Sequence, residues 1–232
     1  LLITWQEFFV GGMVNQRFWM TIVAIGTLCA ANSARAERRT FAEVYEPEVN
    51  GKDVMDLLLW NQLGHKWKNS AVDDTKFRIE LQYGLTDQLD MTVYQNFEQS
   101  PSTNQDLKFE STAVELRYLL APRGEWPIDV LVYLEAYKKY SSAEFELEPK
   151  LVVGKACGKW RWTANLFAEV EIEGSAEVTP AFSLAGGYDY SDKLRFGLEA
   201  TSELAETITA RGDESRELVA AGGPTLHFQP SP

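Results

Sequence analysis

One stretch of the chain, residues 75–98, constrains the fold more than any other. It reads TKFRIELQYGLTDQLDMTVYQNFE, and apolar and polar side chains alternate on both sides of a central segment, 84–88. Successive side chains of a β-strand point to opposite faces, so this alternation gives each strand one apolar and one polar face. Gly84, Thr86 and Asp87 supply turn chemistry between the two runs. The stretch predicts an antiparallel hairpin whose strands can cross a bilayer when tilted, which takes about 9–11 residues each.

The same pattern recurs along the rest of the chain. Besides the two strands of the hairpin, we expect strands at 54–67, 109–120, 128–137, 145–155, 160–173, 178–190, 194–203 and 217–228. The connections at one end are short: 85–88, 121–127, 156–159 and 191–193. Those at the other end are mostly longer and more polar: 68–74, 99–108, 138–144 and 204–216. This asymmetry is typical of outer-membrane barrels, in which the short turns are periplasmic. We therefore predict an all-β fold, an antiparallel up-and-down outer-membrane β-barrel of about ten strands.

A soluble β-sandwich or a lipocalin-like barrel would also show alternating strands. Two features favour the membrane barrel instead. Acidic side chains occur along whole polar faces rather than only at strand ends. Aromatic residues bracket the apolar faces, as the interfacial girdles of membrane barrels do. They are Trp60, Trp67, Tyr83, Phe97, Tyr118, Trp126, Trp160, Trp162 and Tyr190.

The N-terminal part of the chain predicts export. Residues 13–36 contain a basic start at Arg17, an apolar run over 20–31 and a small-x-small cleavage sequence at 34–36. These are the features of a secretory signal peptide, with cleavage expected before Glu37. We therefore divide the chain into upstream read-through at 1–12, a signal peptide at 13–36, a periplasmic N-terminal lead at 37–53 and a β-barrel domain at 54–232. The predicted location is the outer membrane.

Three further segments carry a resemblance to known proteins: 41–47 (FAEVYEP), 80–89 (ELQYGLTDQL) and 222–226 (GGPTL). Together with the signal peptide, they resemble a group of bacterial outer-membrane β-barrel proteins of unassigned role, related to the proposed transporters of the phenol meta-pathway type. The resemblance spans most of the exported chain and implies the barrel fold. Its motifs are turn and strand patterns, so it implies no substrate.

Members of that group usually continue into a further hairpin that ends on an aromatic residue, whereas this chain stops at 229–232. The resemblance therefore implies a twelve-stranded barrel that lacks its last hairpin. In the final segment, Gly222 and Gly223 supply no packing and Pro224 has no N–H to donate. We expect a gap or a poorly bonded seam between the first strand, 54–67, and the last, 217–228.

The functional prediction depends on the polar faces. The formal net charge of −12 argues against nucleic acid and against an anionic membrane surface as partners. If the apolar faces meet outer-membrane lipid, the charged side chains of the other faces line the lumen. These candidate lumen-lining residues are Arg78, Glu80, Asp90, Glu115, Arg117, Asp129, Glu135, Glu146, Glu148, Lys150, Arg161, Glu169, Glu171, Arg195 and Glu199.

Such a lumen has two interpretations. It is either a narrow polar conduit that favours cations, as rings of carboxylates do, or a filled interior in which the charges pair and nothing passes. Small barrels are close to the size at which side chains fill the bore. We predict a small passive channel or transporter for small solutes. The alternatives are a non-conducting structural or adhesion barrel and an outer-membrane lipid hydrolase. The oligomeric state is left open.

Evidence for catalysis in the sequence is thin. The only histidines are His65 and His227, and there is no Gly-x-Ser-x-Gly, no His-x-x-x-His and no cysteine pair in the exported part. The acids at 169, 171 and 173 have the residue type of glycosidase carboxylates, but a solvated wall explains them more simply. His65 is the residue that a lipid hydrolase would use. We predict no catalytic residue, no metal site, no cofactor and no enzymatic activity.

Overall fold

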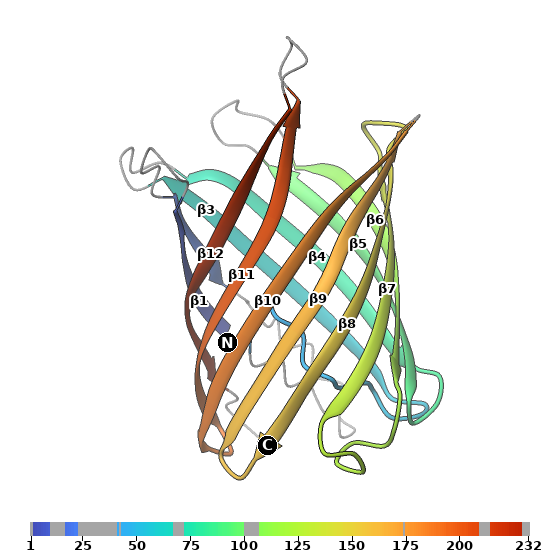
Figure 1. Cartoon of the computed structure of the whole chain (residues 1–232), viewed down its shortest axis with the longest axis vertical. Coiled ribbons are helices and arrows are strands. Elements are labelled where there is room, and N and C mark those ends of the chain that lie inside the picture. The colour runs from blue at the N-terminus through green and yellow to red at the C-terminus, as the bar shows by residue number, and fades with distance from the viewer. Residues whose placement is uncertain are drawn as a thin grey trace.

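The computed structural model describes residues 2–9, 17–22, 41, 43–66, 72–99, 107–173, 175–208 and 214–228. These residues form twelve strands and a closed barrel (Figure 1). The strands are β1 (Leu2–Phe9), β2 (Arg17–Ile22), β3 (Met55–Lys66), β4 (Val72–Gly84), β5 (Leu89–Gln99), β6 (Lys108–Leu119), β7 (Asp129–Lys139), β8 (Phe145–Cys157), β9 (Trp160–Glu173), β10 (Ser175–Ser191), β11 (Leu194–Ile208) and β12 (Glu214–Phe228). Each strand pairs antiparallel with its neighbours in sequence, and β1 also pairs with β12.

The ten strands β3–β12 are the ones that the alternation predicts, in the predicted order, and the up-and-down barrel is confirmed. The organising hairpin is β4–β5, in register from Thr75↔Gln99 to Gly84↔Asp90. Strands β11 and β12 are longer than expected, because much of the predicted loop 204–216 is paired strand. No helix in the described part of the chain is long and apolar enough to span a membrane.

Closure of the barrel differs from the prediction. Strands β3 and β12 do not pair with each other in the described residues, as expected, but no gap separates them. Strands β1 and β2 lie between them: Leu2 pairs with His227 of β12, and Thr21 pairs with Gln62 of β3. The open seam is therefore wrong for this structure. The physical reason is that unpaired edge groups within hydrocarbon each cost several kcal/mol, so a strand that satisfies them is strongly favoured.

These two strands come from residues 2–9 and 17–22, which the sequence analysis assigned to upstream read-through and to the signal peptide. In the structure both segments are part of the sheet. Cleavage before Glu37 stays a prediction.

The two faces of the wall have the predicted orientation. Leu81 and Leu166 expose 45% and 61% of their surface on the outside, whereas Glu80 exposes 1% on the inside. In β6 the inward residues are buried and the outward ones are exposed in strict alternation from Ala113 to Leu119. The outer surface is thus a continuous apolar band, as a lipid-facing wall requires.

Aromatic side chains flank this band at both ends. At the long-loop end, Phe77, Phe97 and Phe109 form a row across β4, β5 and β6, with ring centroids 5.8 and 4.9 Å apart. At the short-turn end, Trp160 and Tyr188 lie 4.8 Å apart on β9 and β10. Two girdles separated by an apolar band are the mark of a membrane-spanning barrel, so the structure is that of an outer-membrane β-barrel.

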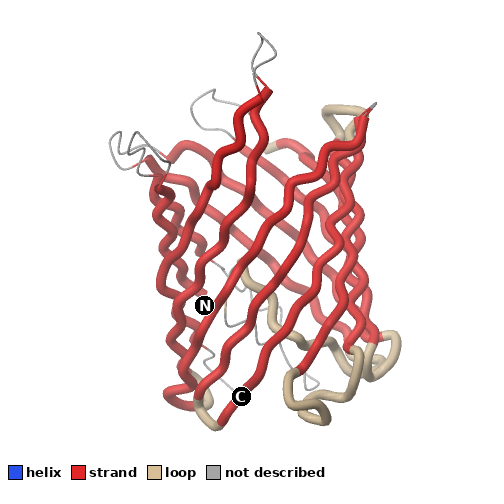
Figure 2. Tube along the Cα trace, viewed as in Figure 1, coloured by secondary structure: helices blue, strands red, loops and turns tan. Residues whose placement is uncertain are grey.

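The segment before β3 does not lie outside the barrel. Phe41 and residues 43–54 run as irregular chain through the interior, near the end that carries the short turns (Figure 2). The sequence analysis placed this segment, as part of 37–53, in a periplasmic lead. The segment does lie near the short-turn end of the barrel, as predicted. It lies inside the bore, however, because its polar backbone groups find hydrogen-bond partners there.

Candidate functional site

The interior of the barrel is organised around Phe41 and residues 43–54, which we call the plug segment. Its centre is Tyr45. The Tyr45 N–H donates to Asn165 Oδ1 at 2.8 Å, and its carbonyl oxygen accepts from Thr163 Oγ1 at 2.7 Å and from Asn165 Nδ2 at 2.9 Å. Asn165 and Thr163 are fully buried on the inner face of β9. Two wall side chains therefore replace the water that the plug backbone would otherwise bind.

Both ends of the plug segment are held in the same way. The N–H groups of Glu43 and Val44 donate to Glu199 Oε2 on β11, at 3.0 and 3.3 Å. The N–H of Asn50 donates to Asp90 Oδ2 on β5 at 2.7 Å. The plug segment thus spans the bore from one wall to the opposite one.

Glycines in the wall make room for it. Phe41 packs with Val44 and Ala185, beside Gly187 and Gly197, which pair across β10 and β11. A Cβ on Gly197 would lie 2.8 Å from Phe41 Cε1, and one on Gly187 would lie 3.3 Å from Phe41 Cζ. Glycine weakens a strand unless something approaches it closely. These inward glycines are the signal in the sequence from which the plug could have been found.

The inner face also carries an apolar cluster that a water-filled bore would not favour. Leu119, Leu131 and Val152 are buried on β6, β7 and β8, and Tyr45 and Val49 of the plug segment pack against them. Alternation put Leu131 on the polar face. It is tolerated there because the plug, rather than water, covers it.

The predicted lumen-lining residues all lie on the inward face of their strands. Those that are buried are Glu80, Asp90, Glu115, Arg117, Asp129, Lys150, Arg161, Arg195 and Glu199. Those that are partly exposed are Arg78, Glu135, Glu146, Glu148 and Glu169, and Glu171 is exposed. The structure therefore divides them into a buried group, mainly around the plug, and a more accessible group.

Around the plug the basic side chains are paired. Arg117 binds both carboxylate oxygens of Asp90, at 2.9 and 2.8 Å, and its Nε lies 3.1 Å from Glu115. Arg161 joins Glu46 of the plug segment, at 2.8 Å, to Asp189, at 2.6 Å. Fork-shaped guanidinium contacts of this kind fix geometry as well as charge.

Two further contacts connect the plug segment to the wall electrostatically. The Lys150 ammonium lies 4.2 Å from the centre of the Tyr45 ring, close enough for a cation–π interaction. Glu48 lies 2.5 Å from Arg123 and 3.9 Å from Arg161. Burial, reinforced by the neighbouring Glu46 carboxylate, raises the pKa of Glu48 above its ordinary value.

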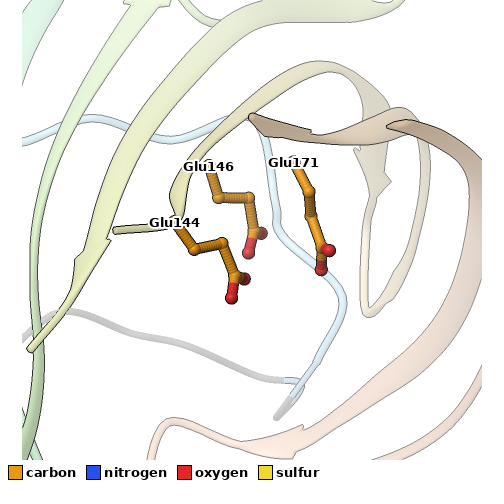
Figure 3. Close-up of side chains that lie close together, drawn as sticks. All are labelled: Glu144, Glu146 and Glu171. Atoms are coloured by element: carbon orange, nitrogen blue, oxygen red, sulfur yellow. The ribbon is translucent and has the colours of Figure 1, made fainter. Parts of the chain in front are cut away.

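The interior on the long-loop side of the plug is acid-rich. Glu144, Glu146 and Glu171 point toward one another, with carboxylate oxygens within 4.8 Å (Figure 3). Lys139 forms an ion pair with Glu144. A cavity of about 240 Å³ is lined by residues of β3 to β7 and by Glu43 of the plug segment. Its other lining residues include Trp60, Gln62, Arg78, Asn96, Glu110 and Tyr137.

The residues considered for catalysis are not brought together. His65 belongs to β3 and pairs through its backbone with Val72, and its side chain lies outside the described part. His227 is on β12, opposite Arg195. The acids at 169 and 171 stand on the inward face of β9, and the side chain of residue 173 lies outside the described part. Whether the protein has enzymatic activity stays a matter of prediction.

No protein-family model and no curated protein matches the chain. Among solved structures, it is similar to a bacterial polysaccharide outer membrane secretin, with 9% identity and a TM-score of 0.48 over 92% of this chain and 69% of that one. It is also similar to OmpT of Vibrio cholerae folded in vitro, with 10% identity and a TM-score of 0.37 over 92% of this chain and 64% of that one. For the trimer form of that protein the identity is 10% and the TM-score 0.41, over 98% and 97%. With TM-scores below 0.5, neither the fold nor the function of this chain is inferred from these likenesses.

Proposed function

We propose that this protein is an outer-membrane channel for small solutes whose bore is closed by its own plug segment in the state described, and which conducts when the plug shifts. The observation that supports this is the way in which the plug is held. Its contacts to the wall are hydrogen bonds, ion pairs, a cation–π contact and apolar packing, all of them non-covalent and therefore reversible. A typical hydrogen bond of this kind contributes only about 0.5–1.5 kcal/mol.

The charge of the interior supports a preference for cations. The basic side chains near the plug are engaged with acids, and the carboxylates on the long-loop side are in excess over the lysines beside them. Carboxylates along a narrow pore raise the local concentration of cations and repel anions. A solute that enters from the long-loop end meets the acid-rich space and the 240 Å³ cavity before it meets the plug.

The alternative is a barrel that never opens and serves a structural or adhesive role. The apolar cluster of Leu119, Leu131 and Val152 favours it, because a permanently filled interior is the natural place for such side chains. An outer-membrane lipid hydrolase is the third candidate, which a lipid-hydrolysis assay of wild type and His65→Ala tests. The relation to transporters of the phenol meta-pathway type stays an expectation from the resemblance.

Planar-bilayer recordings of the refolded protein test the proposal. Wild type should show rare openings, and the reversal potential in a KCl gradient should report cation preference. Asn165→Val removes the amide oxygen and amide nitrogen that bind the Tyr45 backbone, leaves only the Thr163 hydroxyl bond, and should raise the open fraction. The matched control is Leu166→Val, one residue along β9 on the lipid face, which should behave as wild type. If neither wild type nor Asn165→Val conducts, the structural alternative is correct.

A further inference from the structure

The inner wall contains buried oxygen atoms that have no partner. Glu80 on β4 is 1% exposed, and neither of its carboxylate oxygens has a hydrogen-bond partner in the described structure. Gln82 Oε1 and Thr92 Oγ1 are fully buried and likewise unsatisfied. A buried charge is costly unless it is paired, and most buried polar atoms in proteins have a partner. These atoms therefore need a partner from outside the described polypeptide, either ordered water or a bound ion.

The three side chains belong to one patch of wall. Gln82 stands directly opposite Thr92 in the β4–β5 register, and Glu80 is two residues away on the same face of β4. Side chains directly opposite each other on paired strands have Cβ atoms about 4.5–5.5 Å apart. Glu80, Gln82 and Thr92 are thus neighbours in one inward-facing patch of the wall.

The neighbouring groups fix the character of this patch. The Gln82 amide nitrogen donates to Asp90 Oδ2 at 2.8 Å, which assigns the amide orientation and leaves its oxygen as the unsatisfied atom. The nearby cations have hydrogen-bond partners other than Glu80, although the Glu80 charge acts on the Arg78 guanidinium group. Arg78 donates to Asn96 at 2.7 Å and lies over the Tyr94 ring, and Arg117 is paired with Asp90. No ion pair to Glu80 forms among the described residues.

We propose that Glu80, Gln82 and Thr92 bind a hard divalent cation inside the barrel wall. Carboxylate, amide and hydroxyl oxygens are the ligands that such cations prefer, and Ca²⁺ tolerates the irregular geometry of a site of this kind. The Glu80 carboxylate, which is 1% exposed, supplies the negative charge that such a cation needs at this patch.

The site is distinct from the exposed acid cluster of Glu144, Glu146 and Glu171, and it does not depend on whether the barrel conducts. It lies beside Asp90, which holds the Asn50 end of the plug segment. Bound cation would therefore reinforce the wall at the point where the plug is fastened.

Thermal unfolding of the refolded full chain in neutral detergent, first with EDTA and then with added CaCl₂, tests the site, and calorimetric titration gives the affinity. Wild type should show a Ca²⁺-dependent rise in Tm. Glu80→Gln should lose this rise, and in EDTA it should melt above wild type because an amide replaces an unpaired buried carboxylate. Thr92→Val, which removes one ligand, should bind Ca²⁺ more weakly.

The matched control is Glu171→Gln, which removes an acid of the exposed cluster and should keep the full Ca²⁺ response. The proposal is overturned if wild type shows no response, if Glu80→Gln keeps it, or if Glu171→Gln loses it. The last outcome would place the ion at the exposed acids.

Discussion

Removal of the Phe41 side chain is the sharpest test of whether the plug segment closes the bore. Phe41 is 1% exposed and sits between Val44, Ala185 and the paired glycines 187 and 197. Phe41→Ala takes away the apolar anchor at one end of the plug segment and leaves its backbone hydrogen bonds in place.

The size of the effect follows from the burial. A fully buried phenylalanine contributes about 1.5–3 kcal/mol relative to an exposed one, and Phe→Ala in a packed core costs about 3–5 kcal/mol when the cavity stays empty. Water from the lumen can enter here, so the lower range applies. A loss of about 3 kcal/mol changes the closed-to-open ratio by roughly 100-fold, because each 1.4 kcal/mol is a factor of about ten.

Two assays measure that ratio. One is the open fraction in planar bilayers. The other is the rate of thiol labelling of Val44→Cys in a chain whose Cys29 and Cys157 are replaced by serine, because Val44 is only 2% exposed in the docked plug and labelling should require undocking. The labelling rate should rise by the same factor as the open fraction.

The control is Phe182→Ala, which removes a ring of the same size from the lipid-facing side of β10. If Phe41→Ala labels no faster than Phe182→Ala, the plug is not held by this anchor and the reasoning fails. If labelling becomes faster but no current flows, the plug moves but the barrel does not conduct.

The remaining predictions concern orientation, pH and export. Leu166→Arg places a charge near the middle of the lipid face and should destabilise the barrel in lipid by about 2–4 kcal/mol, whereas Glu169→Arg on the inward face should be tolerated; equal urea midpoints for the two variants would contradict the orientation. Because docking of the plug raises the pKa of Glu48, docking takes up a proton, so it is favoured below that pKa and weakens as the pH rises through it. Openings should be rarer in acidic than in neutral buffer, and Glu48→Gln should remove this part of the difference. Mass spectrometry of the protein extracted from outer membranes tests the predicted cleavage: Glu37 as the first residue would mean that β1 and β2 are lost on export, whereas a chain that retains residues 13–36 would disprove the cleavage.

Ten of the twelve wall strands described, β3–β12, could be predicted from the sequence because alternation is a local property. Within each of the strands β3–β12, the alternation of apolar and polar residues identifies the lipid-facing side, and each connection is short enough to pair neighbouring strands. The sequence of the plug segment has no such periodic pattern. Its contacts join Tyr45 to Asn165 and Val44 to Glu199, across most of the chain, and an irregular segment has no period to detect.

Asn165 is a residue whose role cannot be predicted from alternation alone. Alternation marks it as an inward position that would tolerate a large polar residue. In the structure its amide is shared between the Tyr45 backbone and Ser183, so an arginine there would displace the plug. The inward orientation of Asn165 was predicted correctly. Its need for an amide group, however, comes from its hydrogen bonds to Tyr45 in the plug segment, 120 residues away in the sequence.

The join between the plug segment and β3 has a kinetic consequence. Residues 51–54 are fixed to the β4–β5 turn: the Asp53 N–H donates to the Gly84 carbonyl at 2.9 Å, and the Gly84 N–H donates to the Val54 carbonyl at 2.9 Å. A plug that leaves its seat therefore stays tethered to the barrel, and its return is an intramolecular event. Short tethers give effective concentrations in the millimolar range. Re-closure is then independent of protein concentration, and a soluble peptide with the plug sequence should compete only when added at comparable, millimolar levels.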